Sequence, residues 1–145
     1  MSNRHTRYQA AIVREHHILL LWYVPRDRSG FWLIPGGGRE AETEEACVIR
    51  EVHEETHLHV RVGRLIVEQP APHRDAMYMR YKTYLCTPVG GDERPGIEPE
   101  ADAQGIIERV DWFDLRDVDS WHHTLVRDHI TYPQLLEIRS VLGYS

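Results

Sequence analysis

The chain has 145 residues, of which 41% are hydrophobic, and a formal net charge of −6. A chain of this length buries about 68–70% of the surface that it exposes when unfolded, so one domain over residues 1–145 is expected, with residues 1–6 as a loose end. The negative charge argues against binding to a nucleic-acid polymer or to an anionic membrane, and two cysteines are too few for a disulfide framework. No apolar stretch of the sequence is long enough to span a membrane, and we expect a cytoplasmic protein.

Two short runs rich in Ile, Leu and Val, residues 8–13 and 17–24, predict buried strands joined by a turn at residues 14–16. Residues 31–34 predict a third strand. The Pro-Gly-Gly-Gly stretch that follows, residues 35–38, is poorly suited to a strand, and we expect a turn there.

Residues 43–57 predict an α-helix. Thr43 is the expected N-cap, and two glutamates follow in the first turn, where the helix dipole favours negative charge. At about 100° per residue, one side of this helix is mainly apolar and is predicted to face the core. That side comprises Ala46, Ile49, Val52 and Thr56.

Glu51, Glu54 and Glu55 fall together on the opposite side of the predicted helix, and Arg50 lies one turn before Glu54 and can pair with it. Each pair of like charges at this spacing destabilises an exposed helix by about 0.2–0.5 kcal/mol. A hard divalent cation would remove the repulsion, and a site made of oxygen ligands suits Mg²⁺ or Mn²⁺, which also bind phosphate oxygens. The alternative interpretation is a solvated acidic helix face without a ligand.

The spacing of residues around this helix resembles the signature of the Nudix hydrolase family. That signature is glycine, five residues, glutamate, seven residues, Arg-Glu, an apolar residue, any residue, Glu-Glu, any residue, glycine and an apolar residue. The matching positions here are Gly36, Glu42, Arg50, Glu51, Val52, Glu54, Glu55 and Leu58. His57 replaces the second glycine, at a helix end where φ is often positive and glycine is favoured.

The resemblance implies an α/β fold in which a mixed β-sheet lies between helices, a Nudix-like α/β/α sandwich. It also implies a Mg²⁺-dependent hydrolase, with Mn²⁺ able to substitute, that cleaves a diphosphate linkage in a nucleotide or a nucleoside diphosphate derivative. Glu54 and Glu55 would hold the metal, and a backbone carbonyl of Gly36 or Gly37 would add a ligand.

The remaining roles also follow from the resemblance. Glu51 would be either a further ligand or the base that deprotonates water. Arg50 would orient the helix carboxylates, and Glu42 would pair with Arg50. Many family members carry one more residue and another glycine between the positions of Gly36 and Glu42, which leaves the choice between the two carbonyls open.

The same segment supports two other interpretations. His53-Glu54-Glu55-Thr56-His57 satisfies H-E-x-x-H, the zinc-protease motif, in which both histidines would bind Zn²⁺ and Glu54 would act as base. No clear third ligand follows, since His59 is too close and His73 is only one candidate. The other interpretation is a non-catalytic nucleotide-binding module on the same fold, supported only by His57 in place of glycine.

After the helix, residues 58–67 are suited to a strand with a bulge or bend at Gly63, and residues 70–75 predict a loop. Residues 77–86 alternate along a further predicted strand. One face of that strand is a candidate wall for an anionic, aromatic substrate, or else a solvent-facing polar surface. This face carries Tyr78, Arg80, Lys82, Tyr84 and Cys86.

Residues 87–104 predict a long loop, and loops of this length are often functional or mobile. In the enzymes that this chain resembles, a glutamate from such a loop sometimes reaches the metal site, and Glu98 and Glu100 are the candidates. Beyond the loop, residues 106–113 predict a strand with Trp112 in the core.

Thr131 is the predicted N-cap of a last helix, with Pro133 in its first turn. The apolar stripe of this helix comprises Leu135, Ile138 and Leu142, and Gly143 ends it. The sequence leaves the substrate open among several kinds of nucleotide, because specificity comes from loops outside the matched segment. It is compatible with a homodimer.

Overall fold

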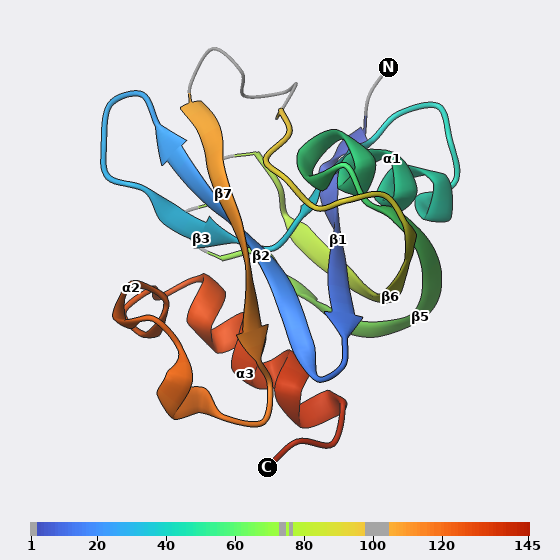
Figure 1. Cartoon of the computed structure of the whole chain (residues 1–145). Helices are drawn as coiled ribbons and strands as arrows, with labels where there is room; N and C mark the ends of the chain where they lie inside the picture. Colours follow the sequence, from blue (N-terminus) through green and yellow to red (C-terminus); the bar gives the residue numbers. More distant parts are fainter. Residues whose placement is uncertain (1–2, 73–74, 76, 98–104) are drawn as a thin grey trace.

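A computed structural model of the chain describes residues 3–72, 75, 77–97 and 105–145 (Figure 1). Its strands are β1 (Asn3–Arg14), β2 (His17–Pro25), β3 (Phe31–Leu33), β4 (Gly36–Arg39), β5 (His59–Pro70), β6 (Arg80–Gly90) and β7 (Gly105–Asp114). Its helices are α1 (Glu44–Thr56), the short 3-10 helix η1 (Val118–Ser120), α2 (His123–Val126) and α3 (Thr131–Val141). Helix α1 packs on one side of the strands and α2 and α3 on the other, which confirms the predicted α/β sandwich (Figure 1).

Strand β1 is the strand on which the sheet is built. It pairs antiparallel with β2 and β4, and parallel with β6. Strand β2 also pairs antiparallel with β3 and β7, and β5 pairs antiparallel with β6. The sheet is therefore mixed, as predicted, and the long connection between its two parallel strands contains α1.

The turn between β1 and β2 consists of Glu15 and His16, which both have positive φ angles, 48° and 71°. Two consecutive residues of this kind form a tight turn whose twist matches that of the flanking strands. The predicted hairpin is therefore confirmed, and the pair Arg14↔His17 closes its register.

The predicted turn at residues 35–38 is wrong, because Gly36–Arg39 forms strand β4. Gly36 pairs with Gln9 and Gly37 pairs with Tyr8 of β1. A Cβ atom on Gly36 would lie 2.3 Å from the backbone oxygen of Tyr8, so only glycine permits this approach. Glycine in a strand interior often marks such a close backbone contact, and here that role outweighs its poor strand propensity.

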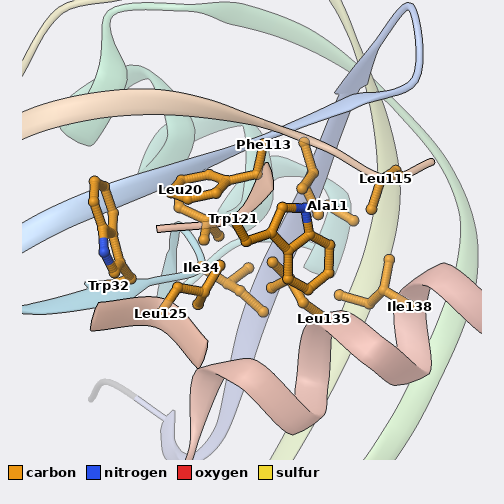
Figure 2. Close-up of a cluster of buried hydrophobic side chains, with 11 residues drawn as sticks. Ala11, Leu20, Trp32, Ile34, Phe113, Leu115, Trp121, Leu125, Leu135 and Ile138 are labelled. Atoms are coloured by element: carbon orange, nitrogen blue, oxygen red, sulfur yellow. The ribbon is translucent and has the colours of Figure 1, made fainter. Parts of the chain in front are cut away.

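Two hydrophobic clusters hold the helices to the sheet. The cluster under α1 includes Tyr8, Ala10, Ile12, Leu19, Cys47, Val48, Val52 and Leu58. Figure 2 shows the cluster under α3, which contains Ala11, Ile18, Leu20, Trp32, Ile34, Phe113, Leu115, Trp121, Leu125, Leu135 and Ile138. Trp112, predicted in the core, is only partly buried and packs against the first cluster.

Helix α3 begins near the predicted position, but the prediction of Thr131 as its N-cap is wrong. The Oδ1 atom of Asp128 accepts hydrogen bonds from the backbone N–H groups of Ile130 and Thr131, both at 2.8 Å. The Thr131 hydroxyl instead donates to the backbone oxygen of Trp32 at 2.7 Å. Because the Asp128 carboxylate accepts from these amide groups, the Thr131 hydroxyl is available to connect α3 to β3.

The strands after α1 differ from prediction mainly at their ends. The register of β5 against β6 shifts between Val62 and Leu65, which confirms an irregularity at Gly63. Strand β6 begins at Arg80, later than predicted, because the N–H groups of Met77 and Tyr78 donate to Asp75 Oδ1 in a turn. Within the described residues, none of the helices is long and apolar enough to cross a bilayer.

Leu135 and Leu136 are neighbours on α3 that differ in burial, with exposed fractions of 0% and 37%. Truncating a buried leucine loses its transfer free energy and leaves a cavity, so Leu135→Ala should lower the free energy of unfolding by about 2–5 kcal/mol. Leu136→Ala should change it by less than about 1 kcal/mol. Urea unfolding followed by circular dichroism compares the two variants, and equal losses would contradict this placement of α3.

Candidate metal centre

Helix α1 forms where the sequence predicts it, with both ends defined by specific contacts. The Thr43 side chain accepts a hydrogen bond from the N–H of Ala46 at 3.1 Å, and Glu44 and Glu45 occupy the first turn. At the other end His57 has φ 65°, and its N–H donates to the backbone oxygen of His53 at 3.0 Å. The left-handed conformation expected at the position of the missing glycine is therefore present, adopted by a histidine.

The predicted division of α1 into an apolar and an acidic side is only partly correct, because Val52 and Thr56 are buried as predicted but share their face with acids. Ala46 is exposed, whereas Glu51 and Glu55 have exposed fractions of 0% and lie on the buried face. That face comprises Cys47, Val48, Glu51, Val52, Glu55 and Thr56. The helix therefore buries two adjacent residues in each successive turn. The acids fit on this face because the glycines of strand β4, which lies beside it, leave room for carboxylates.

Strand β4 receives both buried carboxylates. The N–H of Gly36 donates to Oε1 of Glu55 at 2.9 Å. A Cβ atom on Gly37 would lie 2.0 Å from Oε2 of Glu51, so the backbone of Gly37 is in close contact with that carboxylate. The two glycines thus fix the position of α1 against β4 through its two buried acids.

Arg50 joins the acids of this region through one guanidinium group. Its Nη2 atom lies 2.6 Å from Oε2 of Glu42, and its Nε atom also donates to that carboxylate at 3.0 Å. Its Nη1 atom lies 3.3 Å from Glu54 and 3.4 Å from Glu51. The pairing of Arg50 with Glu42 and Glu54 is therefore present, and its Nη2 atom also contacts the backbone oxygen of Gly38 at 3.3 Å.

The chemistry of the donor set fits a hard divalent cation. Glu51, Glu54 and Glu55 offer only oxygen atoms, and buried carboxylates are costly unless positive charge or hydrogen bonds offset them. In this structure Arg50 contacts two of the three, and no three acidic, histidine or cysteine side chains among the described residues are gathered closely enough to enclose an ion. Of the candidate carbonyls, that of Gly37 faces α1, with the Cys47 sulfur 3.9 Å away.

The residues predicted on β6 line the start of α1 and the neighbouring strand. Lys82 Nζ lies 2.8 Å from Oε1 of Glu44, and the Tyr84 hydroxyl donates to the same carboxylate. Burial alone would raise the pKa of Glu44, but these two hydrogen bonds outweigh it, and the pKa is lowered. Arg80 pairs with Glu68 at 2.8 Å.

Three further predictions concern side chains beyond the helix. Tyr78 is buried, and it precedes β6 rather than lying on it. Glu98 and Glu100 lie outside the described residues. The sequence analysis did not identify Gly96, whose N–H donates to the backbone oxygen of Glu55 at 2.9 Å. A glycine directly after Pro95 in a long loop was the available signal for a close backbone contact.

The histidines of the H-E-x-x-H match lie at the C-terminal end of α1. His53 is exposed, and its ring lies 6.3 Å from that of His57 and stacks on His59 at 4.6 Å between centroids. Among the described residues these rings are not part of a cluster that could hold a metal ion. His73 lies outside that part of the chain.

The sequence of this chain is similar to a known protein family and to several curated proteins. The family model of the NUDIX domain matches residues 4–134. The NAD-capped RNA hydrolase NudC of Vibrio parahaemolyticus is 36% identical over 109 residues, which are 74% of this chain and 38% of that protein. Human diphosphoinositol polyphosphate phosphohydrolase 3-alpha is 31% identical over 91 residues, 59% of this chain and 49% of that protein. The chain thus spans less than half the length of these curated relatives.

Solved structures resemble the whole fold. An ADP-ribose pyrophosphatase from Streptococcus suis has a TM-score of 0.68 at 22% identity, covering 99% of this chain and 95% of that one. A MutT NUDIX hydrolase from Burkholderia pseudomallei has a TM-score of 0.66 at 27% identity, covering 92% and 97%. The likeness extends over both helical layers and the sheet between them.

His57→Gly should raise the free energy of unfolding by about 0.5–1 kcal/mol, because glycine adopts φ 65° without the cost that a side chain brings. His53→Gly is the matched control, since it places the same residue inside the helix and should lower stability by about 0.5–1 kcal/mol. Thermal and urea unfolding of both variants give the comparison. Destabilisation by both would contradict a left-handed His57.

Glu42→Gln tests the central ion pair through pH. The hydrogen bond from Arg50 lowers the pKa of Glu42, so the ionised carboxylate stabilises the fold above its unfolded pKa of about 4.3 and loses this effect as the pH falls through the lower folded pKa. The variant should be less stable than the wild type by about 1–3 kcal/mol at pH 7, and the gap should close below pH ~4. Exposed Glu137→Gln serves as control in the same urea titrations. A gap independent of pH would show that the ion pair is not its source.

Proposed function

Because the chain belongs to the Nudix hydrolase family, we propose that it is a Mg²⁺-dependent enzyme that cleaves a diphosphate linkage in a nucleotide or a nucleoside diphosphate derivative. The observation that carries this proposal is that Arg50 and strand β4 hold three glutamates of α1 in place. Glu51, Glu54 and Glu55 lie within about one turn, and two of them are fully buried beside the glycine strand. Mn²⁺, which accepts the same oxygen ligands, is expected to substitute.

Glu54 and Glu55 would hold the metal ion, together with a carbonyl of Gly36 or Gly37. Glu51 would be a further ligand or the base that takes the proton of the attacking water. When bound, the ion supplies a Lewis acid for phosphoryl oxygens and lowers the pKa of water.

The protein itself supplies orientation. Arg50 contacts Glu51 and Glu54 while Glu42 holds the other side of its guanidinium group, so the carboxylates keep fixed directions. The N–H of Gly36 holds Glu55 in the same way. Fixed acids need no rearrangement during the reaction, which is the usual source of electrostatic catalysis.

Electrostatics explain why a cation is required. The substrate diphosphate, the α1 carboxylates and the chain as a whole, with its net charge of −6, are all negative. Two unit charges 4 Å apart interact by about 4 kcal/mol at an effective dielectric constant of 20. A divalent cation between the carboxylates and the phosphates turns this repulsion into attraction, so removal of the ion should stop both binding and turnover.

The relatives suggest which substrates to test first. NAD caps, diphosphoinositol polyphosphates and ADP-ribose, which appear in the names of the similar proteins, all contain a diphosphate group. A panel therefore includes NAD, ADP-ribose, a diphosphoinositol polyphosphate and nucleoside triphosphates. An NAD-capped oligonucleotide is added to test whether the RNA polymer contributes to recognition. The negative charge of the chain predicts that the polymer contributes little.

Glu55→Gln should reduce kcat at least about 100-fold while leaving the unfolding midpoint nearly unchanged. The amide oxygen of glutamine can still accept from Gly36, but the charge needed to hold the ion is lost. Exposed Glu45→Gln, on the same helix, should retain activity. Product release is measured across the panel with Mg²⁺, with Mn²⁺ and with EDTA.

The outcomes separate the candidate functions. Release that depends on metal and is lost in Glu55→Gln supports the hydrolase. Undiminished turnover in that variant would remove the proposed chemistry. Tight nucleotide binding without release from any substrate would instead favour a non-catalytic binding module on this fold.

A further inference from the structure

The C-terminal end of α1 is completed by a distant part of the chain. The last carbonyls of a helix have no partner within the helix. Here the backbone oxygens of Glu54, Glu55 and Thr56 accept from the N–H groups of Ile97, Gly96 and Arg94, at 2.9, 2.9 and 3.0 Å. We call residues 91–97, which include these three donors, the capping segment.

The capping segment depends on glycine at two positions. A Cβ atom on Gly96 would lie 1.9 Å from the backbone oxygen of Glu54, a distance that no side chain tolerates. Gly91 has φ +84°, and a Cβ atom there would lie 2.3 Å from the backbone oxygen of His57. Gly90, just before the segment, differs, because a Cβ atom there would meet nothing closer than the His59 side chain at 3.8 Å.

The segment is also anchored away from the helix. Glu93 accepts hydrogen bonds from Arg14 at 2.7 Å and from the indole N–H of Trp112 at 3.0 Å. The Arg14 guanidinium lies 4.3 Å from the centre of the Trp112 ring. The end of α1 is thereby connected to β1 and β7, rather than left to a local turn.

The backbone bonded by the segment carries two of the acids assigned to the metal ion. Helix ends fray readily, and a glutamate in the last turn keeps its direction only while its backbone stays helical. We propose that Gly96 is a positioning residue, through which the capping segment fixes the backbone of Glu54 and Glu55 for metal binding. The part that concerns the metal rests on the function proposed above.

Gly96→Ala tests this proposal against two controls. Gly90→Ala makes the same change six residues earlier in an open place, and Leu135→Ala destabilises the fold on the opposite side of the sheet. The dissociation constant for Mn²⁺ is measured without substrate by electron paramagnetic resonance. Amide hydrogen exchange is measured on peptides covering residues 50–58.

In Gly96→Ala the Mn²⁺ dissociation constant should rise about tenfold or more, as is typical when residues that orient metal ligands are changed. Exchange in residues 50–58 should accelerate. Gly90→Ala should change neither quantity, and Leu135→Ala should keep wild-type Mn²⁺ affinity although it is less stable.

Two results would overturn the proposal. An unchanged Mn²⁺ affinity in Gly96→Ala would show that the segment does not position the acids, and an equal loss in Leu135→Ala would reduce the effect to general destabilisation. A wild-type protein that binds no Mn²⁺ would refute the proposed function instead. The capping role would then be decided by hydrogen exchange, and equal exchange in Gly96→Ala and Gly90→Ala would reject it.

Discussion

The buried carboxylates of α1 and the glycines of β4 hold the helix and the strand together. Glu51 and Glu55 are fully buried, and burying a carboxylate is costly unless it is paired or hydrogen-bonded. They fit because Gly36 offers an N–H group and Gly37 offers no side chain. A bulkier strand would push α1 away from the sheet and would open the hydrophobic cluster beneath it. The contacts that position the helix therefore also position the acids.

Arg50 distributes one positive charge over several negative ones. A guanidinium group can do this because its donors form a rigid, planar fork, whereas a lysine would act as a point charge. Two of its donors face Glu42, and a third faces Glu51 and Glu54. Its pKa is raised, first by the hydrogen bond to Glu42, so it stays charged at every accessible pH. The carboxylates still outnumber the cation that contacts them, which leaves the negative field that a divalent ion would meet.

Local patterns in the sequence predicted local structure well. The cap at Thr43, the helix end at His57 and the hairpin turn all depend on residues within a few positions of each other. The predictions were wrong where contacts between distant parts of the chain determine the conformation or the burial of a residue. Residues 36–39 are a strand because β1 pairs with them, and Glu51 faces inward because β4 leaves space for it. Thr131 does not cap α3, because its hydroxyl donates to β3, and Asp128 accepts from the first amide groups of the helix instead. Periodicity shows which residues share a face, but it cannot show that a buried face accepts acids.

His57 illustrates how the two kinds of contact combine. A non-glycine residue in the left-handed region costs roughly 1–2 kcal/mol, and glycine is the usual solution at a helix end. In this chain the glycines stand elsewhere, at positions 91 and 96, where they allow another segment to approach the last turn of α1. Three backbone hydrogen bonds from that segment, each contributing about 0.5–1.5 kcal/mol, are sufficient to offset the strain. The end of α1 is consequently specified by its local cap and by these tertiary hydrogen bonds together. The loop that follows β6 thus belongs to the same structural unit as Glu54 and Glu55.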